Sequence, residues 1–368
     1  MILFITRKYP PSVGGMEQLS FYLTTGVADR EPVRIIKWGG SQKWLPFFVI
    51  FAVVRALWLL ATQPVDLIHM SDLVLAPVGW FLRLVGRRPV VANAHGLDVI
   101  YPNRLYQAIV LSCARRLDRV ICNSEHTRRQ CVKRGIAEAH TCVIPAGIAP
   151  EAFRISMSEP ERSRWRARWG IADEPSHILL TVGRLVPRKG VYFFVTEVLP
   201  RLAKRRSDWA YLVIGDGPER QRIAEATWRD ESIAQRVHLL GQVPDDELGA
   251  AYAAADLFVM PNVAVLGDSE GFGIVTLEAR AAGLSVVASD VDGIADSFST
   301  AEAGFLVPPG DAVAFVDAIE RQMDVPLTPA ARLDRSRQIA ARYGWTRIIA
   351  DYLDVFRSVR AQVAPNRG

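Results

Sequence analysis

Two glutamates eight positions apart flank a glycine-rich turn in the second half of the sequence. The segment reads EGFGIVTLE and runs from Glu270 to Glu278, with Gly271 and Gly273 on either side of Phe272. Eight residues make about 2.2 helical turns, which places both carboxylates on one side of a helix that starts here. Ionised carboxylates accept hydrogen bonds from vicinal diols, such as those of ribose and hexoses. The pattern therefore indicates a site for a hydroxyl-rich ligand. The alternative, a helix-terminal glutamate followed by a solvated one, leaves the Gly-Phe-Gly turn unexplained.

A second loop, TVGRLVPRKG at 181–190, has the composition of an anion site. Gly183 and Gly190 allow tight turns that aim backbone N–H groups at an anion, and Arg184 and Lys189 add two cations. A guanidinium can fork two phosphate oxygens, whereas an ammonium acts as a point charge. The GxxxxGK[ST] pattern of a Walker loop is absent. Taken alone, the loop fits a diphosphate site and an ordinary basic surface turn equally well.

Alternating strands and helices must position these loops. Short apolar runs rich in β-branched residues recur along the chain, each followed by a longer helical stretch, as in parallel sheets covered by helices. Strands are predicted at 2–6, 33–37, 66–70, 89–93, 119–123, 142–144, 178–182, 210–214, 237–240, 256–260 and 285–289.

A polar, arginine-rich segment without a strand signal separates the two halves of this pattern. The sequence therefore predicts an α/β protein of two doubly wound, Rossmann-like domains, with a ligand cleft facing the carboxyl ends of the strands. The expected boundaries are 1–155 for the first domain, 156–174 for a linker and 175–345 for the second domain. A final helix at 346–368 is expected to return to the first domain.

Charge is distributed unevenly along the chain. Residues 1–150 hold 18 Lys/Arg against 9 Asp/Glu, a net charge of +9, while the remainder holds 26 against 30, a net charge of −4. A basic half favours an anionic partner, and without a nucleic-acid-binding motif we favour an anionic membrane surface over nucleic acid. An ordinary solvated basic face explains the same charges equally well.

Two further features bear on location. The most apolar stretch, 45–61, includes Pro46 and Arg55 and is slightly short of the ~20 apolar residues that a spanning helix needs. It therefore predicts a buried or surface-lying helix.

The start of the chain lacks the pattern of a secretory signal, and the four widely spaced cysteines are typical of free, buried thiols. We expect a cytoplasmic protein, and a peripheral position on the inner face of the membrane stays open.

The run EGFGIVTLEARAAGLSVVAS resembles the signature of retaining GT-B glycosyltransferases of the family-4 (group 1) type. Further segments match the same family in the same order over nearly the whole chain. These are GGME at 14–17, HGLD at 95–98, VIPAG at 143–147, VGRLVPRKG at 182–190, VIGDGP at 213–218 and GFLVPPGD at 304–311.

The resemblance implies a role for each matching residue. Glu278 is expected to hold the ribose of the nucleotide, and Arg184 and Lys189 the diphosphate. Glu270 and the amides of Gly271 to Gly273 are expected to hold the transferred sugar, with Phe272 shaping the pocket. The resemblance places Gly15 near the phosphates or the reacting sugar, and His95 beside the sugar.

Three positions depart from the family pattern: Ala146 replaces an asparagine, Leu284 a proline, and Asp292-Gly293 a Gly-Gly pair. None of them touches the paired glutamates or the two cations, so the donor-binding pattern is complete. Asp290 and Asp292 form a DxD, but GT-B enzymes generally use no metal there. We therefore interpret the two aspartates as a loop and helix-cap feature.

The resemblance thus implies a retaining hexosyltransferase that uses GDP-mannose or a UDP-hexose and acts on a glycan or lipid-linked acceptor. Transfer would proceed by front-face attack, without a metal or other cofactor and without nucleic acid as a partner. A nucleotide-sugar epimerase on the same fold is one alternative, although epimerases lack the paired glutamates. A non-catalytic nucleotide or polyanion binder is the other.

Overall fold

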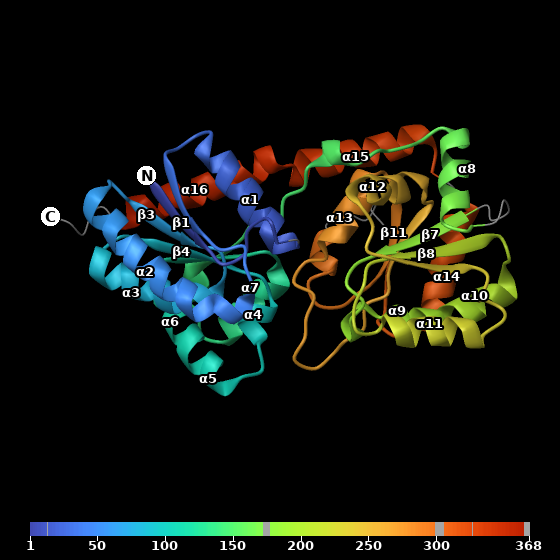
Figure 1. Cartoon of the computed structure of the whole chain (residues 1–368), viewed down its shortest axis with the longest axis horizontal. Coiled ribbons are helices and arrows are strands. Elements are labelled where there is room, and N and C mark those ends of the chain that lie inside the picture. The colour runs from blue at the N-terminus through green and yellow to red at the C-terminus, as the bar shows by residue number, and fades with distance from the viewer. Residues whose placement is uncertain (13, 172–176, 299–304, 326, 364–368) are drawn as a thin grey trace. The chain divides into compact units, whose positions relative to one another are not determined.

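The computed structural model describes residues 1–12, 14–171, 177–298, 305–325 and 327–363. The chain forms two compact units, each built on one parallel β-sheet (Figure 1). Unit 1 comprises residues 1–147 together with 343–368, and unit 2 comprises residues 148–342. Parts of the predicted linker (172–174) and of the predicted final helix (364–368) lie outside the described residues.

The sheet of unit 1 has six parallel strands in the order β2-β1-β3-β4-β5-β6. The chain runs outward from β1 to β2 and then returns to the other side of β1, so that the direction of winding reverses between β1 and β3. Ligands of doubly wound sheets bind outside the carboxyl ends of the strands at such a reversal. The strands are β1 (Ile2–Thr6), β2 (Val33–Lys37), β3 (Leu67–Met70), β4 (Val90–Ala94), β5 (Arg119–Cys122) and β6 (Thr141–Val143).

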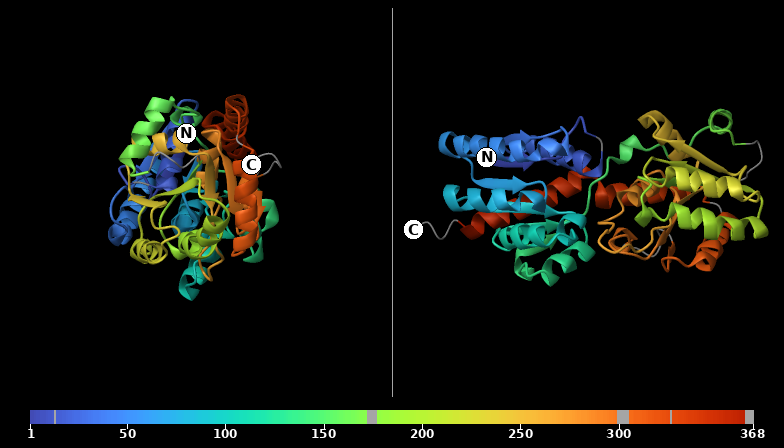
Figure 2. Two further views of the ribbon diagram at one scale, coloured as in Figure 1. Left: turned by 90° about the vertical axis from the view of Figure 1, so that its right-hand side faces the viewer. Right: turned by 60° about the horizontal axis from the view of Figure 1, so that its bottom comes forward.

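Helices cover both faces of this sheet because successive strand residues point to opposite faces. Leu3 and Ile5 of β1 join the core under α2 and α3, whereas Ile2 and Phe4 join the core under α1 and α16. Figures 1 and 2 show the red α16 lying along the blue strands of this unit. The helices are α1 (Gly15–Ala28), α2 (Leu45–Thr62), α3 (Ala76–Gly86), α4 (Leu97–Ile100), α5 (Arg104–Tyr106), α6 (Ser112–Ala114), α7 (Glu125–Lys133) and α16 (Trp345–Val363).

Unit 2 repeats this plan with the order β12-β11-β10-β7-β8-β9, and its winding reverses between β7 and β10. Its strands are β7 (His177–Val182), β8 (Trp209–Ile214), β9 (Val237–Gly241), β10 (Leu257–Met260), β11 (Ser285–Ser289) and β12 (Phe305–Val307). Its helices are α8 (Glu159–Arg168), α9 (Val191–Phe193), α10 (Leu199–Arg205), α11 (Arg220–Arg229), α12 (Asp245–Ala254), α13 (Ile274–Ala281), α14 (Ala312–Asp324) and α15 (Pro329–Tyr343).

The predicted fold class is confirmed, because both sheets are parallel, doubly wound and covered by helices. Each predicted strand is present with both ends within one residue of the prediction. The prediction missed β12, a three-residue strand at the edge of the unit 2 sheet.

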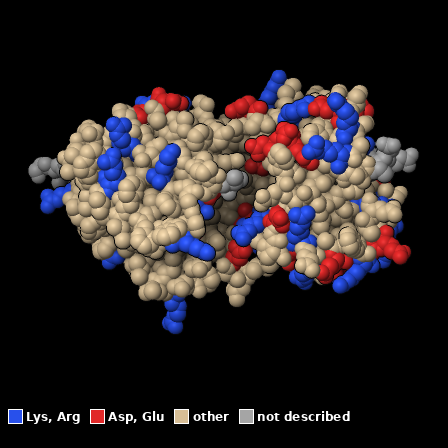
Figure 3. Space-filling view, viewed as in Figure 1, with Lys and Arg blue, Asp and Glu red and all other residues tan. Residues whose placement is uncertain are grey.

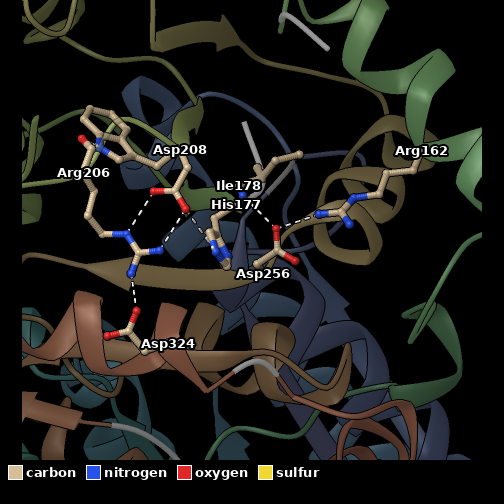
Figure 4. A network of polar contacts seen from close by, with 8 residues as sticks. Arg162, His177, Ile178, Arg206, Asp208, Asp256 and Asp324 are labelled. Carbon is tan, nitrogen blue, oxygen red and sulfur yellow. Dashed lines mark hydrogen bonds and ion pairs between the residues drawn. The ribbon is translucent and has the colours of Figure 1, made fainter. Parts of the chain in front are cut away.

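The arginine-rich segment that suggests a linker contains α8, which is tied to unit 2 (Figure 4). Arg162 of α8 donates to the Asp256 carboxylate at 2.6 Å, and the same carboxylate accepts the backbone amide of Ile178 at 2.8 Å. Asp256 precedes β10 and Ile178 lies in β7, so this network fixes α8 at the amino ends of both strands. The polar side chains of this segment therefore form ion pairs within unit 2, and the segment is part of that folded unit.

Candidate functional site

The two loops singled out in the sequence meet in unit 2. β7 ends at Val182, and the 3-10 turn Pro187–Lys189 follows before α9 begins. The Lys189 ammonium lies 2.7 Å from the Glu270 carboxylate, and the two side chains are only 12% and 13% exposed. Because water screens a buried pair poorly, this contact is electrostatically stronger than an ion pair on the open surface.

Glu270 has two further polar partners. Asn262, just beyond β10, donates its side-chain amide to Glu270 at 3.4 Å, and Arg188 Nε lies 3.5 Å away. Burial on its own would raise the pKa of Glu270, but the adjacent Lys189 and Arg188 cations outweigh it and hold the pKa below its usual range. Glu270 is therefore an ionised carboxylate with a fixed orientation.

The backbone of Glu270 is fixed by the loop after β11. The Asp292 carboxylate accepts the Glu270 amide at 3.0 Å, and the Gly293 amide donates to the Glu270 carbonyl at 3.0 Å. Asp292 has φ of 54°, in the left-handed region that aspartate tolerates better than most residues. The Asp292-Gly293 departure from the family pattern thus positions a predicted site residue.

Close backbone packing joins the two loops at the switch point between β7 and β10. Gly190 has φ of 66°, and a Cβ atom at this position would lie 1.8 Å from the Pro261 carbonyl oxygen. The Val263 amide also donates to the Arg188 carbonyl at 3.0 Å. Only glycine fits at position 190, and this packing brings Lys189 to the carboxyl end of β10.

Glu278 lies on α13, which begins directly after Gly273. Its carboxylate accepts the hydroxyl of the fully buried Tyr252 at 2.7 Å. Burial raises the pKa of Glu278, and the Tyr252 hydrogen bond together with the Lys189 charge offsets only part of this rise. The two motif carboxyl groups, Glu270 and Glu278, therefore have pKa values shifted in opposite directions.

The turn between these glutamates is packed inside the unit. Phe272 is 5% exposed, and Gly271 and Gly273 are buried. Gly273 has φ of 74° and, as the N-cap of α13, has no side chain to occupy the first amides of the helix. These amides are therefore available to oxygen atoms of a ligand.

Arg184 differs from Lys189 in its surroundings. It is exposed, and within the part of the chain that the structure describes it forms no ion pair. Together with Arg188 and Lys189 it places three cations in one loop of six residues, against the two carboxylates of Glu270 and Asp268. This local excess of positive charge suits an anion such as a diphosphate.

Gly15 and His95 lie in unit 1, at the carboxyl ends of β1 and β4. Gly15 begins α1, and a Cβ atom there would meet nothing within 4 Å. The His95 ring Nε2 lies 2.8 Å from the Ser71 carbonyl, and its backbone amide donates to Asp98 at 2.8 Å. The ring is thus held by the loops that follow β3 and β4.

A buried ion pair that the sequence analysis missed lies at this edge of unit 1. The Asp72 carboxylate is fully buried after β3, and Arg7 Nε, after β1, lies 2.7 Å from it. Burial raises the pKa of Asp72, and the Arg7 charge opposes that rise. The available signal was positional, since both residues directly follow predicted strands that are neighbours in the sheet.

The structure thus joins Lys189 to Glu270 directly and Glu278 to Tyr252, while Arg184 contacts neither glutamate. Sequence reasoning also missed Arg188, Asn262 and Tyr252. Across the described residues, no group of three or more His, Cys, Asp or Glu side chains is arranged to hold a metal ion.

Two family models cover most of the chain. One, for glycosyltransferase family 4, matches residues 4–152, and one for glycosyl transferases group 1 matches residues 176–324. Similar proteins include GDP-mannose-dependent α-(1-6)-phosphatidylinositol monomannoside mannosyltransferases. That of Mycolicibacterium smegmatis is 29% identical over 356 residues, 90% of this chain and 91% of the relative. That of Mycobacterium tuberculosis is 30% identical over 315 residues, 83% and 76% of the two chains.

Solved structures with the same architecture cover nearly the whole chain. Anabaena HepE in complex with UDP has a TM-score of 0.77 at 22% identity, covering 97% of this chain and 99% of HepE. Sucrose-phosphate synthase from Thermosynechococcus elongatus has a TM-score of 0.76 at 22% identity, covering 98% and 100%. These likenesses show a shared GT-B fold.

Proposed function

This chain belongs to the family-4 (group 1) glycosyltransferases, and we propose that it transfers a hexose from a nucleotide-diphosphate sugar with retention of configuration. The observation that carries this proposal is the buried Lys189–Glu270 ion pair at the switch point of unit 2. It fixes a cation and a carboxylate beside two glycine turns, where a phosphate and a sugar hydroxyl can be bound side by side.

In the proposed donor complex, Glu278 accepts hydrogen bonds from the ribose hydroxyls. Arg184 and Lys189 neutralise the diphosphate, and Glu270 with the amides of residues 271–273 holds the hexose. GDP-mannose is the first donor to test, because similar proteins are GDP-mannose-dependent. A UDP-hexose is the second.

Transfer proceeds by front-face attack. The bond between the anomeric carbon and the leaving phosphate oxygen breaks, and the oxygen keeps the electron pair. The acceptor oxygen forms the new bond on the same face, and its proton passes to the leaving phosphate. The protein contributes placement and charge stabilisation, and Arg184 and Lys189 meet the developing negative charge. This route needs no metal and no other cofactor.

The acceptor in this proposal is a glycan or a lipid-linked saccharide, reached from the cytoplasmic side. The similar mannosyltransferases are phosphatidylinositol monomannoside mannosyltransferases, which supports the lipid-linked class.

The test is a screen of GDP-mannose, UDP-glucose, UDP-GlcNAc and UDP-galactose, each carrying a labelled hexose, with release of the nucleotide measured in parallel. One donor should be consumed, and with a glycan or lipid-linked acceptor present, NMR of the glycosylated acceptor should show the anomeric configuration of that donor. An inverted product would overturn the retaining mechanism. Donor binding without sugar release would favour a non-catalytic binder, and an isomerised free nucleotide-sugar would favour an epimerase.

A further inference from the structure

Helix α2 is apolar on all sides, but unit 1 covers only one of them. Its sequence, LPFFVIFAVVRALWLLAT, contains one charged residue and has a mean hydropathy of 2.1. Phe48, Ala52, Ala56 and Leu59 recur at helical spacing and are buried against the sheet. A helix that is hydrophobic all round is normally buried all round. We therefore expect the uncovered side of α2 to be covered by a second apolar environment.

That uncovered side is a continuous row of large side chains, which we call the α2 ridge. Its members are 49–64% exposed, and their spacing of three or four residues places them on one face of the helix. Soluble proteins rarely expose so many large apolar side chains together, and such patches mark interaction sites. The ridge consists of Phe47, Ile50, Phe51, Val54 and Trp58.

The neighbouring helix extends this apolar surface. α3 exposes Phe81, Leu84 and Val85. Its last residue, Gly86, lies against α2, because a Cβ atom there would come within 2.9 Å of the Leu60 side chain. The apolar surface therefore continues from one helix to the next.

Basic residues outnumber acidic ones around the ridge, although Arg83 of α3 is ion-paired with Asp118 at 2.8 Å. Residues 32–65 contain four basic and no acidic residues, and residues 73–97 contain three basic and no acidic residues. Arg55 lies on α2 itself, with its guanidinium 4.1 Å from the centre of the Trp58 ring. Over α2, Figure 3 shows tan surface broken by separate blue side chains. Aromatic and basic side chains around an apolar helix face are the composition of an interfacial membrane helix.

We propose that the α2 ridge inserts into the surface of an anionic lipid bilayer. A second copy of the chain is a poorer occupant, because symmetric pairing of this face would bring the same basic residues together. Insertion as a spanning helix is also disfavoured, although α2 has the length and composition for it. Spanning would pull Phe48, Ala52 and Ala56 out of the core of unit 1. The helix therefore lies in the plane of the membrane.

The ridge begins beside the edge of unit 1 that carries Gly15 and His95. α2 follows β2, and the connecting loop is tied to the loop before α1, where Ser12 donates to the Gly39 carbonyl at 2.6 Å. A bilayer touching the start of α2 would therefore hold the head group of a lipid-linked acceptor near this edge. This step rests on the proposed function, whereas membrane binding itself does not.

The experiment is vesicle flotation of the full-length protein, without donor. One set of vesicles is pure phosphatidylcholine, and the other contains equal parts of phosphatidylcholine and phosphatidylglycerol. Wild-type protein should float with the anionic vesicles, and high salt should weaken the binding. The triple variant Phe47→Ser/Phe51→Ser/Trp58→Ser should lose about tenfold or more in vesicle affinity, because it removes three inserting side chains.

Trp228→Ser is the matched control, since Trp228 is 81% exposed but lies in unit 2. This variant should float like wild type, and both variants should keep the wild-type circular dichroism spectrum and nucleotide affinity. No flotation of wild type, equal flotation with both vesicle types, or undiminished flotation of the triple variant would overturn the proposal. A dimer in light scattering that the triple variant converts to a monomer would also overturn it, in favour of a second copy. Because nucleotide binding is measured without vesicles, failure of the donor site would be seen separately.

Discussion

At the scale of single residues, the two motif glutamates occupy opposite electrostatic environments. Glu270 contacts two cations and has a lowered pKa, whereas the half-buried Glu278 accepts a hydrogen bond from a tyrosine and has a raised pKa. An ionised carboxylate is needed to accept two hydroxyl groups of a diol. In the proposed donor complex, the ribose hydroxyls would therefore stabilise the charged form of a carboxyl group whose pKa is raised in the free protein.

Removing either side of the donor site should impair catalysis. We expect Glu278→Ala and Lys189→Ala each to lower kcat/KM by about thirty- to a thousand-fold, because losing a charged partner of a substrate costs ~2–4 kcal/mol. Steady-state kinetics with the preferred donor give the values. Glu225→Ala, at an exposed carboxylate of α11, is the control and should stay near wild type. Near-normal kcat/KM in both site variants would refute the donor-site assignment.

The raised pKa of Glu278 predicts a pH effect of defined sign. The folded-state pKa lies above the ordinary 4.5, so its contribution to stability is complete below 4.5 and is lost as pH rises through the folded value. At neutral pH, Glu278→Gln should therefore raise the melting temperature while weakening nucleotide affinity. Wild-type affinity should fall as pH drops toward the Glu278 pKa, and binding there should release a proton, measurable by calorimetry in two buffers. A Glu278→Gln profile with the same pH dependence would exclude this residue.

Residue identities were easier to predict from the sequence than their contacts. Glu270 and Glu278 are singled out by their spacing, and Lys189 by its place in a segment that resembles the family pattern. Asn262 and Tyr252 meet the glutamates only after β10 and α12 have packed beside β7 and α13, and no local pattern records that. The sequence indicates a loop and helix-cap role for Asp292; the residue does lie in a loop, and its carboxylate accepts the backbone amide of Glu270 there. Such partners follow from tertiary packing, which a single sequence does not reveal.

At the scale of elements, glycines set how closely the loops of unit 2 approach one another. We expect Gly190→Ala to destabilise the protein by roughly 1–3 kcal/mol, because it forces a left-handed φ on alanine and a Cβ atom against the Pro261 carbonyl. Gly249→Ala is the matched control, since it lies inside α12 and its Cβ would meet nothing within 4 Å. It should be stabilising by about 0.5–1 kcal/mol. Urea unfolding of both variants measures the two changes in stability. Equal unfolding midpoints for the two variants would contradict the role given to Gly190.

Element types and order followed from the sequence almost completely, since buried parallel strands produce unmistakable apolar runs. The surroundings of individual helices could not be predicted from the sequence in the same way. The polarity of α8 suggests a linker, although Arg162 anchors that helix to Asp256. The apolarity of α2 predicts a buried or surface-lying helix. In the structure one face of α2 is buried and the opposite face is exposed. Hydropathy reports the composition of a helix, whereas burial depends on which neighbours are present.

At the scale of the whole molecule, the proposed chemistry predicts indifference to metal ions. Phosphate charge is met by Arg184, Lys189 and helix amides, so turnover should survive EDTA. The measurement is kcat/KM after chelation and again after addition of Mn²⁺ or Mg²⁺. If chelation abolished activity and Mn²⁺ restored it, Asp290 and Asp292 would have to be reconsidered as ligands.

The position of α16 has a consequence for folding during synthesis on the ribosome. Its apolar side, including Ile348, Tyr352 and Phe356, covers one face of the unit 1 sheet, where Phe356 packs edge-on against Phe4. Unit 1 therefore stays unfinished until the whole of unit 2 has been synthesised, and in the meantime the part of this sheet face that α16 covers is exposed, with only α1 of the described helices packed on the face. A fragment of residues 148–342 should fold alone, whereas a fragment of residues 1–147 should aggregate unless a peptide of residues 343–363 is supplied. β1 thus receives α16, one of its two covering helices on this face, only after unit 2 has been made.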